Sequence, residues 1–281
     1  MNYKKLFFPI GGGDELEERL YASLLIAKTF DTRLEVLKCG LKSNTSMYKT
    51  LSIPRDILSK IDEVVDSKYK DDNDEIKALF EKVASEVDIN ISSEASKEKA
   101  FAHLKVREGL RSTLIEQESK FCDLVIAAAP SGVTTATFET AVLKSGKQVL
   151  MFPRIMRKFS LDSIIIGWNN STEASRAVTS SIELLKKAQR VHIVSSPEYV
   201  EDSEIMKNLI EYLKLHDIDA SYEIVKTTRI PGQALLNAAL DGNFDLIVAG
   251  AYGHKGLKEL MFGGATRYLL EKSTLPIFMS H

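Results

Sequence analysis

Apolar and polar residues follow one another in two similar patterns along this chain of 281 residues. Residues 6–39 begin with a short apolar run, pass through a turn rich in glycine into a helix-like stretch, and end in a second apolar run. Residues 163–196 repeat this order, and both helix-like stretches carry apolar residues at the spacing of an amphipathic helix. A strand, a helix and a strand at this spacing predict the βαβ unit of a parallel sheet, with right-handed crossovers.

The ends of the two patterns match as well. An aspartate precedes a buried-type strand in FCDLVIAAAPS at 121–131 and in NFDLIVAGAYG at 243–253. Each pattern then closes on a further apolar strand, at 148–153 and at 276–280. The repeat therefore predicts an α/β fold with two tandem, open, five-stranded parallel sheets flanked by helices.

The two halves are expected to meet in the basic segment PRIMRKFS, between Phe152 and Asp162. This boundary gives a first domain at 1–155 and a second at 160–281. The first domain carries an additional charged stretch from about 41 to 100, which predicts two exposed helices with modest apolar stripes.

Polar residues mark where the first helix of each half begins. Asp14 with Glu17, and Asn170 with Glu173, fit an N-cap residue and its capping partner. The three glycines at 11–13 are interpreted as an ordinary turn between a strand and a helix, because no GK[ST] element follows them.

A glycine-rich segment, GAYGHKGLKELMFGGATRYLLEK, follows the buried strand of the second half. Two residues separate Gly250 from Gly253, and nine more separate Gly253 from Gly263. Without a Cβ atom, backbone N–H groups can approach a phosphate closely. The end of the segment predicts a helix whose positive N-terminus lies near Gly264 and Thr266. Because ligands of open parallel sheets bind beyond the carboxyl ends of the strands, this segment is predicted to bind phosphate groups.

This arrangement resembles the universal stress protein family, whose nucleotide-binding members carry G-x2-G-x9-G followed by Ser or Thr. The resemblance covers essentially the whole chain, as two tandem copies, and implies the fold of the adenine nucleotide α-hydrolases. It implies that Gly250, Gly253 and Gly263 line the phosphates of ATP. Gly264 stands where the family usually has a hydroxyl, and we expect the hydroxyl of Thr266 to replace part of the lost hydrogen bond.

A second departure from the family pattern is Asn169, at the end of the first strand of the second half. The family commonly has Asp there, near the adenine, the ribose and a metal. Asn keeps the capacity for hydrogen bonds but loses the negative charge, which weakens any contact with Mg²⁺. A role for Asn169 in capping the next helix is an equal alternative. The resemblance also implies that Val194 and Ser195 supply backbone contacts to adenine; whether Mg²⁺ accompanies ATP stays open.

The first half departs further from the family pattern. Ala128 and Ser131 take the places of the glycines, and 20 residues lead from Ala128 to Gln148 against 26 from Gly250 to Pro276. The first half is therefore predicted to bind no nucleotide and to serve as a partner for the second. The resemblance implies that the halves pair about a pseudo-twofold axis, as single-domain relatives do in homodimers, and a further homodimer stays open.

Other candidate residues allow structural as well as functional interpretations. His254 lies in the glycine-rich segment and His281 ends the last strand, so a shared metal and no metal role at all both stay open. Trp168 is interpreted as a core residue rather than a stacking platform. Cys39 and Cys122 match no metal-binding spacing and are too few for a disulfide framework, which predicts a reducing, cytoplasmic compartment.

Composition and motif content narrow the functional classes. A formal net charge of −2 argues against nucleic acid as a partner. No apolar run approaches the roughly 18 residues of a membrane span, and the run at 6–10 is interpreted as a strand rather than part of a signal peptide. No catalytic motif appears, so at most slow ATP hydrolysis is expected. The leading hypothesis is an ATP-binding stress-response protein; the alternatives are a nucleotide-free scaffold with a vestigial loop, and an enzyme related to the α-hydrolases.

Overall fold

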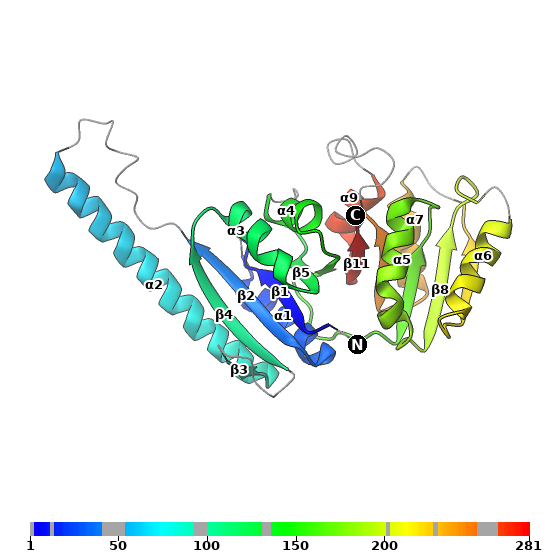
Figure 1. The fold of residues 1–281 in the computed structure, drawn as a ribbon, viewed down its shortest axis with the longest axis horizontal. Coiled ribbons are helices and arrows are strands. Elements are labelled where there is room, and N and C mark those ends of the chain that lie inside the picture. Colours follow the sequence, from blue (N-terminus) through cyan, green and yellow to red (C-terminus); the bar gives the residue numbers. More distant parts are fainter. Residues whose placement is uncertain are drawn as a thin grey trace.

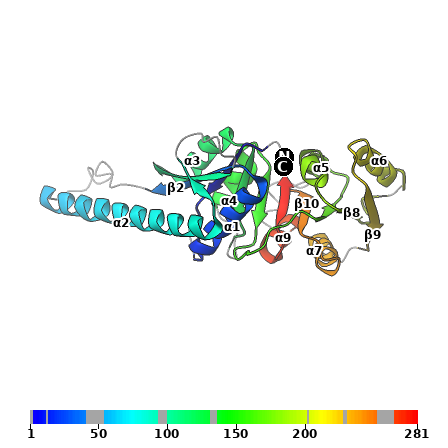
Figure 2. The ribbon, with the colours of Figure 1, turned by 90° about the horizontal axis from the view of Figure 1, so that it is seen from below.

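The chain folds into one extended sheet covered by helices on both faces (Figures 1 and 2). The computed structural model describes residues 3–11, 14–40, 54–92, 100–130, 136–200, 203–226, 230–251 and 264–281. Within these residues the strands form a single sheet of eleven strands. The predicted α/β class is confirmed. The two sheets expected from the sequence are joined edge to edge rather than separate.

The first half contributes parallel strands to one side of the sheet. From the outer edge inward these are β3 (Asn90–Ile91), β4 (Phe101–Glu108), β2 (Arg33–Gly40), β1 (Lys5–Pro9), β5 (Leu124–Ala128) and β6 (Val149–Phe152). Its helices are α1 (Leu16–Phe30), α2 (Arg55–Val87), α3 (Arg111–Glu118) and α4 (Ala136–Lys144), with a 3-10 turn η2 (Ser119–Phe121). The first two helices bury apolar residues on one face of the sheet, and α3 and α4 do so on the other.

The second half contributes the remaining parallel strands. From the centre outward these are β11 (Ile277–Ser280), β10 (Leu246–Gly250), β7 (Ser163–Gly167), β8 (Arg190–Ser195) and β9 (Ala220–Ile224). Its helices are α5 (Thr172–Leu185), α6 (Ser203–Lys214), α7 (Pro231–Asp241) and α9 (Ala265–Lys272). The order β9-β8-β7-β10-β11 repeats the order β4-β2-β1-β5-β6 of the first half.

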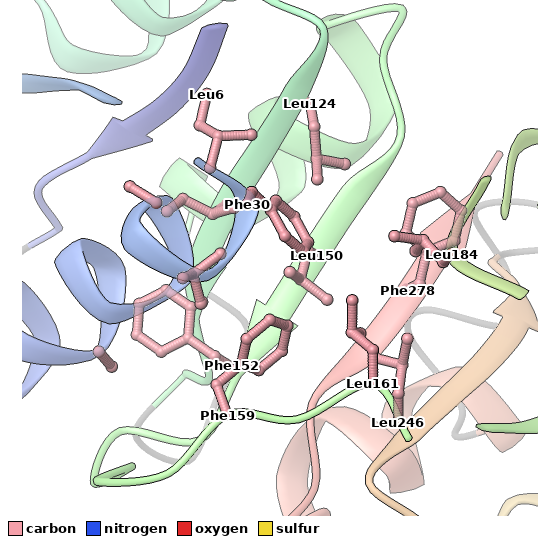
Figure 3. Close-up of a cluster of buried hydrophobic side chains, with 14 of the residues drawn as sticks. Leu6, Phe30, Leu124, Leu150, Phe152, Phe159, Leu161, Leu184, Leu246 and Phe278 are labelled. Carbon is pink, nitrogen blue, oxygen red and sulfur yellow. The ribbon is translucent and has the colours of Figure 1, made fainter. Parts of the chain in front are cut away.

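The two halves meet where β6 and β11 pair antiparallel, with Leu150 opposite Phe278. Apolar side chains from both halves gather around this junction (Figure 3). Leu150, Phe152, Leu184 and Phe278 are all 0% exposed. Burial of a large apolar side chain stabilises a fold by roughly 1.5–3 kcal/mol. The junction is therefore part of the hydrophobic core rather than a polar contact between independent units.

The two aspartates that revealed the repeat bind the backbone of the neighbouring strand. The Asp123 carboxylate accepts hydrogen bonds from the N–H groups of Lys4 at 2.7 Å and Lys5 at 3.0 Å. The Asp245 carboxylate accepts one from the N–H of Ser163 at 2.9 Å. Each aspartate thus ties the start of one central strand to the start of the next, β5 to β1 and β10 to β7.

Three details of the helices differ from the sequence prediction. Residues predicted as two exposed helices form the single helix α2, because no Gly or Pro interrupts 55–87. Helix α2 extends past the ends of β2 and β4 (Figures 1 and 2).

The N-cap of α1 is Glu15 rather than Asp14. The N-cap of α5 is Ser171, whose Oγ accepts from the N–H of Ala174 at 3.1 Å, while Asn170 adopts a left-handed backbone with a φ of 56°.

None of the helices in the described ranges combines the length and the apolar composition that crossing a bilayer requires. The division into domains at 1–155 and 160–281 stays a prediction.

Candidate functional site

A cavity of about 90 Å³ opens at the carboxyl ends of β7, β8 and β10. A cavity holds a water molecule once about 10–15 Å³ is accessible to the water's centre, so this one has room for more than a single water. Five of the residues predicted from the sequence line it together: Asn169, Val194, Ser195, Gly250 and Thr266. This is the position at which open α/β sheets bind their ligands.

Part of the predicted phosphate loop lies outside the described residues. Gly253, Gly263 and His254 fall within 252–263, so their predicted roles stay predictions. Gly264 is described and forms the N-cap of α9 with an extended backbone. The next residue, Ala265, lines the cavity together with Thr266. The N-terminus of α9 therefore faces the site, as the sequence predicts.

Gly250 lacks a side chain for a reason that needs no ligand. A Cβ atom at this position would lie 2.6 Å from the backbone nitrogen of Ala174 and 2.8 Å from the carbonyl carbon of Glu173. Both atoms belong to the first turn of α5. The glycine therefore allows α5 to pack tightly against the end of β10. Gly232 plays a similar part, because its Cβ would lie 2.5 Å from the carbonyl oxygen of Ala265 in α9.

Asn169 lines the cavity and also supports the start of α5. Its Oδ1 accepts hydrogen bonds from the N–H of Ser171 at 3.3 Å and from the hydroxyl of Ser171 at 2.7 Å. The same serine then caps α5. The structure thus shows the helix-supporting role that the sequence left open, and it leaves Asn169 at the cavity wall, where contact with a ligand stays a prediction.

The backbone near Val194 is already engaged. The carbonyl of Val194 accepts a hydrogen bond from the N–H of Trp168 at 2.9 Å, and the hydroxyl of Ser195 donates to the carbonyl of Trp168 at 2.7 Å. These bonds fix the loop after β7 to the end of β8. A ligand that contacts the Val194 carbonyl would have to share it with Trp168.

Two polar groups of the site were missed in the sequence. Trp168, interpreted there as a core residue, lines the cavity, and so does Ser196. The indole Nε1 of Trp168 and the Oγ of Ser196 are buried and have no hydrogen-bond partner in the described part of the chain. A buried polar group without a partner costs about 1–3 kcal/mol. Only their position directly after strand ends marked them in the sequence.

The histidine at the end of the chain and the two cysteines bear on metal binding. The Nδ1 of His281 lies 3.1 Å from the carbonyl oxygen of Ala251, beside the start of the glycine-rich segment. Among the residues that the structure describes, no group of three or more His, Cys, Asp or Glu side chains could hold a metal ion. Cys39 and Cys122 are buried free thiols.

Comparison with known proteins supports the family assignment for the second half. Residues 161–281 match the model of the Universal stress protein family. A curated universal stress protein of Methanocaldococcus jannaschii is 29% identical over 79 residues, which are 27% of this chain and 49% of that protein. The chain therefore spans about half the length of the curated relative that it matches. These findings support a universal stress protein domain at 161–281.

Solved structures extend the likeness of the fold to the whole chain. A universal stress protein from Archaeoglobus fulgidus has a TM-score of 0.70 and 17% identity, covering 99% of this chain and 98% of its own. A protein of unknown function from Pseudomonas aeruginosa has a TM-score of 0.57 and 14% identity, covering 99% and 92%. At such identities the likeness shows the fold alone, which is that of the adenine nucleotide α-hydrolases.

Proposed function

We propose that this chain is a tandem universal stress protein that binds an adenine nucleotide, ATP in the first instance, in its second half. The observation that carries the proposal is the cavity at the carboxyl ends of β7, β8 and β10. It lies within the region that matches the family, and the glycine-rich segment begins at its edge. Binding, rather than fast chemistry, is the proposed activity.

Each predicted residue has a place in this proposal. Asn169 and Val194 would contact the adenosine, with Trp168 and Ser196 offering donors for its polar atoms. The phosphates would extend toward the N-terminus of α9, whose positive end favours anions. There the family spacing assigns the phosphate contacts to four glycines and one threonine: Gly250, Gly253, Gly263, Gly264 and Thr266. The described cavity wall contains no carboxylate, so any Mg²⁺ would be held mainly by the phosphates.

The first half would act as a permanent partner of the second. We propose two domains, at 1–155 and 160–281, that pair through β6 and β11 in the way that two copies of a single-domain relative would pair. A further homodimer and a cytoplasmic location complete the proposal. Both cysteines are free thiols, which agrees with a reducing compartment.

Thermal unfolding with and without nucleotide tests the proposal directly. A ligand at about 100 times its Kd stabilises the folded state by about 2.7 kcal/mol. For a domain of 150–250 residues this corresponds to a rise in Tm of roughly 5–10 °C. We expect ATP to raise the Tm of the natural chain, with EDTA and Mg²⁺ arms to establish whether the ion contributes.

Two loop variants give the matched comparison. Gly253→Val changes a glycine of the family motif, and Gly256→Val changes a glycine of the same segment outside the motif. The ATP response should disappear in the first and persist in the second. An unchanged Tm of the natural chain at millimolar ATP would refute the proposal.

One observation favours a second candidate, a nucleotide-free interaction scaffold. The contact between Gly250 and α5 explains that glycine without a phosphate. This candidate predicts no nucleotide among the small molecules released from the purified protein, as mass spectrometry would detect, and no response of the Tm to ATP.

A further inference from the structure

The first half has its own cavity at the place that corresponds to the nucleotide cavity of the second. It lies at the carboxyl ends of β1 and β5, measures about 40 Å³ and is bounded by the small residues at 127–130 and by α4. Two arginine side chains also line it, Arg19 from α1 and Arg154 from the segment that follows β6. Its volume is less than half that of the cavity in the second half.

Arg19 brings a buried positive charge to this cavity. The residue is only 3% exposed. Its guanidinium donates to the carbonyl oxygens of Gly11 at 3.2 Å and Glu15 at 3.4 Å. Burial lowers the pKa of Arg19 below its usual value; the positive charges of Arg154 and Arg111 lower it further, and the carboxylates of Glu15 and Asp14 act in the opposite direction. An arginine nevertheless stays protonated in a protein, so Arg19 places a positive charge at the wall of the cavity.

Arg154 brings a second guanidinium, which pairs with the carboxylate of Glu15. Its Nε pairs with the carboxylate of Glu15 at 2.5 Å, and its Nη groups donate to the carbonyl oxygens of Asp14 and Ala129. The side chain of Arg154 is 17% exposed, whereas that of Glu15 is 41% exposed. The carboxylate can therefore swing into solvent more easily than the guanidinium can leave the cavity.

The backbone of Glu15 adds to this picture. Its φ of 62° and ψ of 36° lie in the left-handed region, which is uncommon for a residue other than glycine. Conformations of this kind are costly by about 1–3 kcal/mol and persist where the surrounding structure imposes them. The carboxylate of this residue lies against Arg154, in the position that an external anion would take.

We infer that the first half contains a binding site for a small phosphate-type oxyanion, formed by Arg19 and Arg154, with the Glu15 carboxylate as the group that the anion displaces. The planar guanidinium group matches the geometry of phosphate oxygens and forms charge-assisted hydrogen bonds with them. The inference does not depend on nucleotide binding in the second half. It also gives the first half a ligand of its own, in place of the nucleotide that it is predicted not to bind.

The test is a titration of the full chain with inorganic phosphate at constant ionic strength, with chloride as the reference ion. Binding is followed by calorimetry and by the Tm. We expect saturable binding of one phosphate to the natural chain. Arg154→Gln should weaken it at least tenfold. Arg157→Gln is the matched control, because Arg157 lies in the same segment but pairs with Glu18 and Glu86, outside the cavity. It should bind phosphate as the natural chain does.

Glu15→Gln supplies a second, opposite test. Removing the competing carboxylate should tighten phosphate binding, and this readout remains if Arg154→Gln fails to fold. Gly253→Val should leave the phosphate response intact, which separates this site from the one proposed in the second half. Absence of saturable binding, equal weakening in the Arg154 and Arg157 variants, or unchanged affinity in Glu15→Gln would each overturn the inference.

Discussion

A substitution at Gly250 tests whether this glycine is needed for α5 to pack against the end of β10. Its first-half counterpart in the sequence repeat is Ala128, so a Cβ atom is acceptable at one position of the repeat. At Gly250 the same atom would lie 2.6 Å from the nitrogen of Ala174, a separation that real Cβ atoms essentially never show. The change Gly250→Ala must therefore push α5 away from the end of β10.

The size of the effect follows from two opposing contributions. Overpacking a well-packed site costs about 1–3 kcal/mol. Replacing glycine by alanine stabilises the folded state by about 0.4–1 kcal/mol, because it lowers the conformational entropy of the unfolded chain. We expect a net loss in the free energy of unfolding of about 1–2 kcal/mol. In a chain of this size that corresponds to a fall in Tm of roughly 2–8 °C.

Urea unfolding without nucleotide measures this loss, and Gly11→Ala is the control. A Cβ at Gly11 would lie 3.7 Å from the Nη1 of Arg19, an ordinary contact, so stability should stay within about 0.5 kcal/mol of the natural chain. If Gly250→Ala were as stable as Gly11→Ala, the packing explanation would be wrong. The glycine would then have to be explained by the ligand alone.

Three further outcomes follow from the described contacts. Asp123→Ala should lower the free energy of unfolding by about 1 kcal/mol in urea titrations, because two backbone N–H groups lose their acceptor, while Asp123→Asn should retain much of it. Burial raises the pKa of Tyr3 from 10.0 to about 12, with the charges of Asp123 and Glu183 adding to the effect. The folded state then holds a proton that the unfolded chain releases, so stability should fall between pH 10 and 12, and less steeply in Tyr3→Phe. Burial also raises the pKa of Cys122 to about 12. The thiol should therefore resist a disulfide reagent in the native protein and react after unfolding. A rapid reaction in the native protein would contradict its burial.

Much of the architecture could be predicted because it depends on short-range patterns. Strand, helix and strand recur with the same spacing, and Asp123 and Asp245 stand at equivalent points. Both aspartates turn out to perform the same task, binding the backbone at the start of the neighbouring strand. The equivalent positions of Asp123 and Asp245 in the sequence repeat therefore predicted equivalent contacts in the structure.

The details that escaped prediction depend on contacts between distant parts of the chain. Arg154 meets Glu15 although 139 residues separate them, and no local pattern marks such a pair. Asn170 has the residue type of an N-cap, yet its left-handed backbone passes that role to Ser171. Residue type predicts what a side chain can do, whereas the backbone angle decides which neighbour does it.

The two cavities show how equivalent strand ends can differ in volume and charge. In the second half, small residues and the missing Cβ of Gly250 let α5 approach while a cavity of about 90 Å³ remains. In the first half, Arg19 and Arg154 extend into the equivalent space and leave about 40 Å³. The backbone topology is the same in both places, so the two cavities differ through the volume and charge of the side chains at the strand ends. Because the strands of both halves belong to one sheet joined at β6 and β11, ligands at the two edges would act on a single cooperative core. ATP and phosphate should then raise the same unfolding transition, and separate transitions for the two ligands would show that the halves unfold independently.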